Sequence, residues 1–201
     1  SVVYGQVVIN NSAKTTGTTD AIKTVTVDGY ATASTIASNA LTDVTLKNSA
    51  GNMTVTSTVA SLNLTVDDVQ NAVTLTAGNL KTLNLTTTGE EESVFGLVAA
   101  KVETLTIAAA ADLDIATGST LTALKTATIT GAGNVDLGVI SAATGLVSFN
   151  ASANTGGVTA TVLSSAASLN ADGYVFSAGN DDVRLTVSPV NTKVTLGAGD
   201  D

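Results

Sequence analysis

The residues of this chain that could do chemistry are mainly carboxylates, because its 201 residues include no cysteine and no histidine. Thiol and imidazole catalysis, Ser-His-Asp triads and the usual zinc ligand sets are therefore excluded. Any bound metal would have to be held by oxygen atoms, which favours calcium or magnesium.

Two glycine-rich acidic segments near the C-terminus have the spacing of a cation-binding turn. Residues 197–201 read Gly-Ala-Gly-Asp-Asp, which fits G-x-G-x-D, the core of the calcium-binding nonapeptide repeat. Residues 179–183 read Gly-Asn-Asp-Asp-Val. This segment begins shortly after the apolar pattern that ends at Phe176, and the segment at 197–201 directly follows the pattern that ends at Leu196. A calcium ion could lie between these successive turns, bound by carboxylates and turn carbonyls, whereas an acidic turn without metal is the alternative. The predicted calcium-site residues are Gly179, Asn180, Asp181, Asp182, Gly197, Gly199, Asp200 and Asp201.

Two more carboxylates, Asp114 and Asp136, occupy the middle of Leu-Asp-Ile and Val-Asp-Leu and lie 22 residues apart. We expect them to stack on the outer face of adjacent repeats. Adjacent strands are about 5 Å apart, and retaining glycosidases use a pair of carboxylates at about that separation. However, sugar sites usually need aromatic platforms and only 3% of the residues are aromatic, so we predict a solvated pair and no enzyme. The acidic run at residues 90–92 is predicted to be a solvated loop tip.

The elements that must position these carboxylates follow from one six-residue pattern, apolar-x-x-apolar-x-apolar. Its fourth and sixth positions are apolar, and its fifth is Thr or Asn in seven consecutive copies, as expected where strand neighbours face opposite sides. The clearest copies are LKTLNL from Leu80, VETLTI from Val102, LKTATI from Leu124 and LVSFNA from Leu146. Extending outward adds YGQVVI from Tyr4, IKTVTV from Ile22, LTDVTL from Leu41, VASLNL from Val59, ADGYVF from Ala171 and NTKVTL from Asn191.

This pattern predicts an all-β fold, a parallel β-helix or solenoid of about ten coils with a period of roughly 18–25 residues. A second apolar pair follows most copies, so a leucine-rich-repeat horseshoe, whose repeat has a helical second half, ranks second. Lys81, Glu103 and Lys125 fall in one column, which predicts opposite charges side by side on adjacent strands. We interpret residues 1–201 as a single solenoid domain within a longer protein. Residues 177–201 are interpreted as the beginning of the calcium-binding turns.

The chain also resembles a known group of proteins. Its Thr/Ala/Val/Asn-rich strand repeats, its lack of cysteine and its LGAGDD ending are similar to RTX-type bacterial surface-layer (S-layer) proteins and related type I secreted adhesins. The motif itself covers only residues 179–183 and 197–201, and there is no uninterrupted run of nonapeptides. The resemblance implies secretion to a bacterial cell surface, calcium as the bound ion and assembly of the protein with itself.

Composition limits the other partners. A net charge of −9 argues against nucleic acid, which requires clustered Lys and Arg, and no stretch has the roughly 18 apolar residues of a membrane span. The expected function is that of a structural, self-assembling component of a bacterial surface layer stabilised by calcium, with a cell-surface polysaccharide as a further partner. Two alternatives are the stalk of a secreted RTX adhesin and a β-helix polysaccharide lyase or hydrolase.

Overall fold

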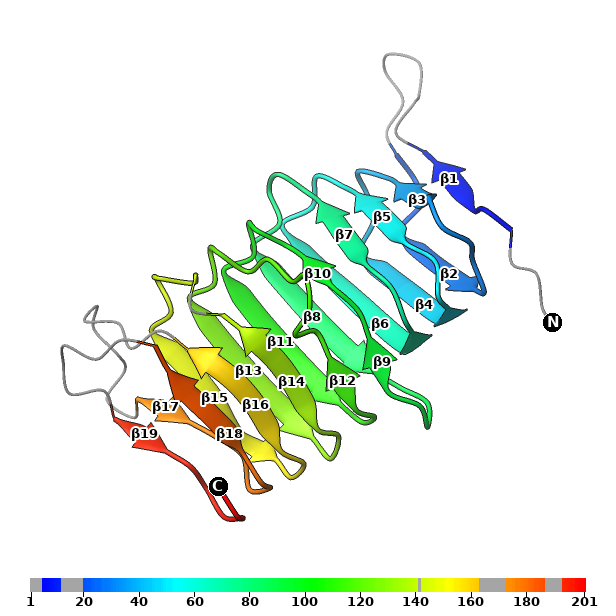
Figure 1. The fold of residues 1–201 in the computed structure, drawn as a ribbon. Helices are drawn as coiled ribbons and strands as arrows, with labels where there is room; N and C mark the ends of the chain where they lie inside the picture. The colour runs from blue at the N-terminus through cyan, green and yellow to red at the C-terminus, as the bar shows by residue number, and fades with distance from the viewer. Residues whose placement is uncertain (1–4, 12–19, 141, 163–172, 187–192) are drawn as a thin grey trace.

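The computed structural model describes residues 5–11, 20–140, 142–162, 173–186 and 193–201. Over these residues the chain winds into a stack of coils whose parallel strands lie side by side, with β1 at one end of the stack and β19 at the other (Figure 1). The predicted all-β parallel solenoid is confirmed, and its period of about 22 residues lies within the predicted range of roughly 18–25. Within the described ranges there is no helix, and so none that could cross a membrane.

The first half of each coil contributes a strand to one long sheet, in which all neighbouring strands are parallel. Paired residues in this sheet are between 19 and 25 positions apart, as shown by Thr24 with Asp43 and Phe149 with Tyr174. The nine strands described in this sheet are β2 (Thr24–Asp28), β4 (Asp43–Ser49), β6 (Ser61–Val69), β8 (Thr82–Thr87), β11 (Thr104–Ala109), β13 (Thr126–Gly131), β15 (Ser148–Asn154), β17 (Tyr174–Val175) and β19 (Val194–Thr195).

The second half of the coils forms two shorter sheets rather than one. The N-terminal sheet consists of β1 (Val8–Asn10), β3 (Ser34–Ala37), β5 (Met53–Thr56), β7 (Val73–Thr76) and β10 (Leu97–Val98). The C-terminal sheet consists of β9 (Ser93–Val94), β12 (Leu113–Asp114), β14 (Val135–Val139), β16 (Val158–Val162) and β18 (Asp182–Leu185). The coil that starts with β8 contributes β9 to one and β10 to the other, so the solenoid changes its cross-section at this coil. Because these second halves are strands, the horseshoe alternative is excluded.

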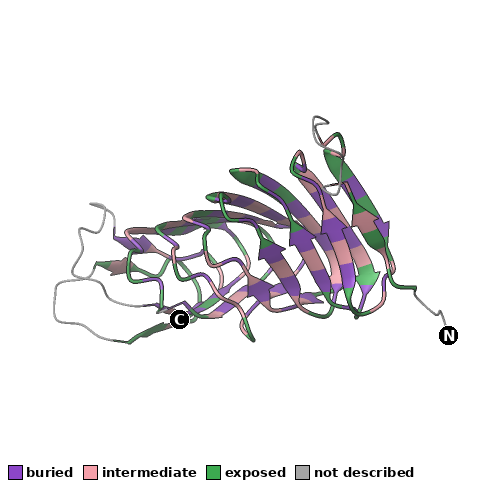
Figure 2. Ribbon diagram, turned by 90° about the horizontal axis from the view of Figure 1, so that it is seen from above, coloured by how far each residue is buried: buried purple, intermediate pink, exposed green. Residues whose placement is uncertain are grey.

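The core lies between the long sheet and the two shorter sheets and follows the predicted alternation. In β11, Leu105 is buried and pairs with Leu83 on one side and Ala127 on the other, which are also buried. Thr106, the next residue, faces outward between Asn84 and Thr128. Buried and more exposed positions therefore alternate along the strands (Figure 2), and each coil buries its apolar residues against its neighbours.

Two details of the predicted alignment are wrong. Val44 pairs with Leu64 and not with Leu62, so the LTDVTL and VASLNL copies stack with a shift of two residues. The first copy, YGQVVI, does not extend the long sheet: its strand β1 pairs with β3 in the N-terminal sheet, with Ile9 opposite Ile36. Tyr4 lies outside the described residues. The long sheet consequently contains one strand fewer, in the described part of the chain, than the ten copies counted from the sequence.

The charged column is confirmed. Glu103 pairs with Lys81 in the preceding coil through Oε1 and with Lys125 in the following coil through Oε2. Hydrogen bonds from Lys125 and Lys81 lower the pKa of Glu103 from its ordinary value of 4.5 to about 2. The Glu103 side chain is 27% exposed and those of Lys81 and Lys125 are 53% and 57% exposed, so water screens the ladder and it specifies register more than it adds stability.

The pH dependence of this ladder can be measured. Because the pKa of Glu103 is lower in the folded chain, the stabilisation is complete above pH 4.5 and is lost as the pH falls through about 2. We expect a carbon-detected NMR titration of the Glu103 carboxyl group to give a midpoint near 2. The double substitution Lys81→Met with Lys125→Met should raise that midpoint towards 4.5, whereas Lys101→Met should not. A wild-type midpoint near 4.5 would show that the three side chains are not paired in solution.

Candidate functional site

The predicted calcium-site residues lie at two consecutive corners at the C-terminal end of the stack. Gly179 belongs to the corner before β18, and its Cα is so close to the preceding coil that a Cβ atom would be 1.4 Å from the carbonyl oxygen of Gly156. Gly197 and Gly199 form the next corner, with backbone φ angles of +26° and +136°. These glycines therefore allow successive corners to stack in contact, a structural requirement that exists without any ion.

Asn180 takes part in a ladder of corner hydrogen bonds. Its Oδ1 accepts the backbone N–H of Asp200 in the next coil at 2.9 Å. Two coils earlier, Asn134 Oδ1 accepts the N–H of Gly157 at 2.9 Å in the same way, and Asp112 Oδ1 accepts the N–H of Asn134 at 2.7 Å. Gly-Asn corners thus join one coil to the next through the side-chain oxygen of the asparagine.

Asp181 is the one buried carboxylate of the predicted set, with 6% of its surface exposed. Its Oδ1 accepts the N–H of Val158 at 2.8 Å and the hydroxyl of Ser177 at 2.6 Å, while Oδ2 accepts the N–H of Ser177 at 3.0 Å. Three protein donors therefore satisfy this carboxylate. By accepting hydrogen bonds from Ser177 in its own coil and from Val158 in the preceding coil, it connects two successive coils.

The remaining carboxylates of the set are exposed. Asp201 Oδ1 accepts the N–H of Asp181 at 3.1 Å, so it repeats the link one coil later. Asp182 lies on β18 opposite Thr159 and not in the corner itself. Among the residues that the structure describes, no three acidic groups come together as a metal-binding cluster.

The fit of calcium to these corners is therefore partial. Three of the roughly four acceptor sites of the Asp181 carboxylate are already used by hydrogen bonds, which leaves it little capacity for an ion, whereas Asp200, Asp201 and the turn carbonyls are accessible oxygen donors of the kind that calcium binds. Calcium binding stays a prediction, and its ligands would have to come from the exposed carboxylates.

The second predicted pair is arranged as expected. Asp114 on β12 lies directly opposite Asp136 on β14. Each forms the same turn, in which Oδ1 accepts a backbone N–H two residues on, from Ala116 and from Gly138 respectively, at 2.7 Å. The glutamate run at residues 90–92 is exposed at the corner between β8 and β9, as predicted. Burial raises the pKa of Glu92, and the negative charges of Asp114, Asp112 and Asp136 raise it further.

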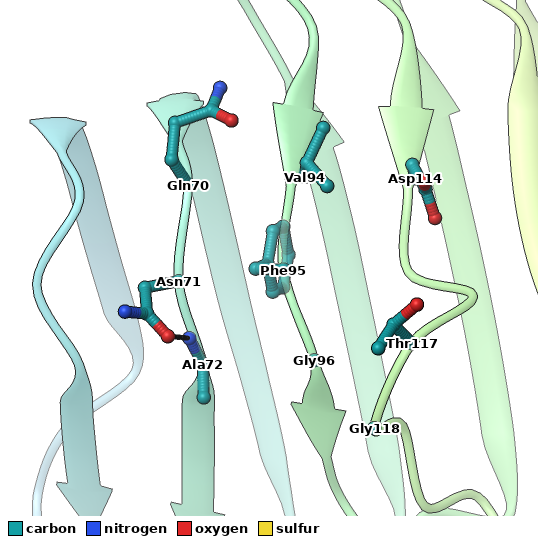
Figure 3. Close-up of a pocket in the computed structure, with 9 residues that line it drawn as sticks. All are labelled: Gln70, Asn71, Ala72, Val94, Phe95, Gly96, Asp114, Thr117 and Gly118. Carbon is teal, nitrogen blue, oxygen red and sulfur yellow. Dashed lines mark hydrogen bonds between the residues drawn. The ribbon is translucent and has the colours of Figure 1, made fainter.

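A pocket of about 280 Å³ beside Asp114 was not predicted from the sequence. It lies where the second halves of the coils change from the N-terminal to the C-terminal sheet, between the chain segments 70–72, 94–96 and 114–118 (Figure 3). The sequence signal that could have located it is the segment from Ser93 to Val98, where Gly96 separates two short apolar pairs instead of one. The pocket lining is Gln70, Asn71, Ala72, Val94, Phe95, Gly96, Asp114, Thr117 and Gly118.

The outward side of the long sheet carries a broad uncharged surface, which we call the threonine–asparagine face. Neighbouring side chains on it are bonded to each other: Asn84 Nδ2 donates to Asn63 Oδ1 at 2.8 Å, and Thr126 Oγ1 donates to Thr104 Oγ1 at 3.2 Å. It consists of Ser61, Asn63 and Thr65 of β6, Thr82, Asn84 and Thr86 of β8, Thr104, Thr106 and Ala108 of β11, Thr126, Thr128 and Thr130 of β13, and Ser148, Asn150 and Ser152 of β15.

Comparison with known proteins assigns no relative. No family model, no curated protein and no solved structure matches this chain. The function must therefore be argued from the geometry described above.

Proposed function

We propose that this chain is a structural segment of a self-assembling protein lattice at a bacterial cell surface, with calcium stabilising its C-terminal coils. The alternative of an adhesin stalk requires the same stack of coils but no lateral contact between copies. The secreted location and the role of calcium rest on the likeness to RTX-type surface-layer proteins in composition and in the segments at residues 179–183 and 197–201.

The observation that carries the proposal is the threonine–asparagine face. It extends over five adjacent strands, with one register shift between β13 and β15 after Thr128, and its side chains are short, uncharged and partly fixed by hydrogen bonds between coils. Ordering such side chains at an interface costs little conformational entropy, and no charge has to be desolvated. A second copy, or the polysaccharide of the cell surface, could therefore pack along this face through repeated hydrogen bonds.

Electron microscopy of the purified chain tests this proposal. We expect ordered two-dimensional arrays in the presence of calcium and fewer or none with a chelator. Thr128→Lys places a charge in the middle of the face, next to Thr106 and Asn150, and should abolish the arrays. Thr76→Lys makes the same change at an exposed position of β7, on the N-terminal sheet, and should leave them intact.

Two outcomes would contradict the proposal. Separate, unassociated rods under every calcium concentration would favour the adhesin stalk. Arrays that survive Thr128→Lys would show that copies meet through another surface.

A further inference from the structure

The two edges of the long sheet carry opposite charges. Since its strands are all parallel, they start along one edge of the sheet and end along the other. Exposed lysines lie within three residues before strands at the first edge. They are Lys23 before β2, Lys81 before β8, Lys101 before β11, Lys125 before β13 and Lys193 before β19. Of the other basic side chains in the described part of the chain, Lys47 lies on β4, where it is bonded to Asp67, and Arg184 lies on β18.

The edge where the strands start keeps a positive excess in the central coils. The residues that we call the lysine edge are Lys81, Lys101, Glu103 and Lys125. Glu103 is bonded to the lysine of the coil before it and to that of the coil after it, and contributes one negative charge against three positive ones. The other described carboxylates on this side, Asp20 and Asp43, lie further towards the N-terminus, before β2 and at the start of β4.

The edge where the strands end is acidic in the same coils. Glu90, Glu91 and Glu92 are exposed in the corner after β8, and Asp112 is half-buried in the corner after β11. We call these four residues the acidic edge. Because both edges belong to the coils that start with β8 and β11, they lie at the same level of the stack, on opposite sides of the long sheet.

This distribution of charge determines how two copies fit side by side. When the long-sheet strands of neighbouring copies run in the same direction, the lysine edge of one copy meets the acidic edge of the next. When the strands run in opposite directions, two lysine edges or two acidic edges meet. Juxtaposed like charges are costly at an interface, whereas opposite charges favour association, so copies in the same orientation are selected.

We propose that a second copy of this chain binds beside the first in the same orientation, with its acidic edge against the lysine edge. Such a contact is heterologous and does not close, so it repeats from copy to copy. The inference rests on the proposed lattice, for which it supplies a second direction of contact. The two edges flank the threonine–asparagine face, so contacts through the face and through the edges are compatible in one lattice.

Sedimentation velocity at low ionic strength, with a chelator present, measures this contact without calcium. We expect the wild-type chain to associate reversibly as its concentration rises. The association should disappear at high salt, because exposed charges are then screened. Thr128→Lys changes the threonine–asparagine face and should leave this association in place.

A charge reversal of the acidic edge separates the proposed contact from a general effect of net charge. The acidic-edge variant combines Glu90→Lys, Glu91→Lys and Glu92→Lys. Each reversal adds two positive charges, so the formal net charge changes from −9 to −3. If net charge alone decided association, the weaker repulsion between copies would strengthen it. The proposed contact predicts the opposite, a weakening of at least about tenfold, because like charges now meet.

A second variant allows a test by mixing. The lysine-edge variant combines Lys81→Glu, Lys101→Glu and Lys125→Glu with Glu103→Lys, which keeps the signs alternating between coils. Alone it should also lose association, because its two edges are both negative. An equimolar mixture of the two variants should recover association, since each variant then meets an edge of opposite charge on the other. A loss caused by misfolding would not be recovered by mixing.

Three results would overturn the inference: a wild-type chain that stays monomeric at low salt, an acidic-edge variant that associates as strongly as the wild type, or a mixture that does not recover association. These results are distinguishable from failure of the lattice proposal. A wild type that associates in this assay but forms no arrays with calcium would contradict the lattice and support the side-by-side contact. Unchanged arrays from the acidic-edge variant would contradict the side-by-side contact and leave the lattice supported.

Discussion

Leu105→Asp is expected to unfold the central coils of the solenoid. Leu105 is 1% exposed and lies between Leu83 and Ala127 in the long sheet. The substitution removes the packing of a leucine and buries a carboxylate with no cation in register beside it. The combined cost should exceed about 3 kcal/mol, which is a large part of the stability of a single domain.

Thr106→Asp is the matched control, because it introduces the same charge at the next residue of the same strand. Thr106 faces outward between Asn84 and Thr128, where water can solvate the carboxylate. Its effect on the free energy of unfolding, measured by urea denaturation, should stay within about 1 kcal/mol. If both variants unfold at the same urea concentration, the inward and outward assignment of the strand is wrong.

The same alternation explains how much of the fold could be predicted from sequence. From Leu80 to Leu146 the copies are a constant 22 residues apart, and the pairings Leu83–Leu105 and Leu105–Ala127 match the predicted columns. Between Leu41 and Val59 the spacing changes, and β6 offers three inward apolar residues, Leu62, Leu64 and Val66. A shift of two residues keeps every side chain on its own face, so apolar periodicity cannot distinguish the two alignments.

The prediction that the first copy joins the long sheet was wrong for a related reason. YGQVVI has the same pattern as the strands of the long sheet, but a strand in the second half of a coil also alternates between inward and outward residues. Which sheet it joins depends on the strand of the neighbouring coil with which it pairs. β1 pairs with β3, and Ile9 lies opposite Ile36. Local pattern identifies a strand, whereas its sheet is decided by contacts between coils.

The candidate sites show the same limit. The stacking of Asp114 on Asp136 could be predicted, because both occupy one column at the regular spacing. The role of Asp181 could not, since one of its donors is the backbone N–H of Val158, 23 residues earlier in the chain. The pocket at Val94 was also missed, because it arises where one sheet ends and another begins and no single coil encodes that junction.

Asp181→Asn should destabilise the C-terminal coils. The carboxylate accepts hydrogen bonds on both oxygens, from Val158 and Ser177. An asparagine has only one acceptor oxygen, and in either orientation its amide nitrogen would face a donor. Buried donors left without an acceptor cost about 1–3 kcal/mol each, so hydrogen exchange of residues 174–185 should become markedly faster. Asp182→Asn makes the same change of charge at the neighbouring exposed residue and should alter exchange little.

Comparing these variants with and without calcium separates a structural cap from a metal ligand. If Asp181 acts through its protein donors, the cost of Asp181→Asn is the same in calcium and in chelator, and this is the result we expect. If Asp181 binds calcium, the loss of stability caused by Asp181→Asn must grow when calcium is added. The reason is that calcium stabilises the wild type but not the variant. This stabilisation is about 2.7 kcal/mol at a hundredfold excess of calcium over Kd. Wild-type protection that rises with calcium, together with a cost of Asp181→Asn that does not, would place the ion on the exposed carboxylates Asp200 and Asp201. A cost that appears only with calcium would contradict the structural role assigned to Asp181 and make it a ligand.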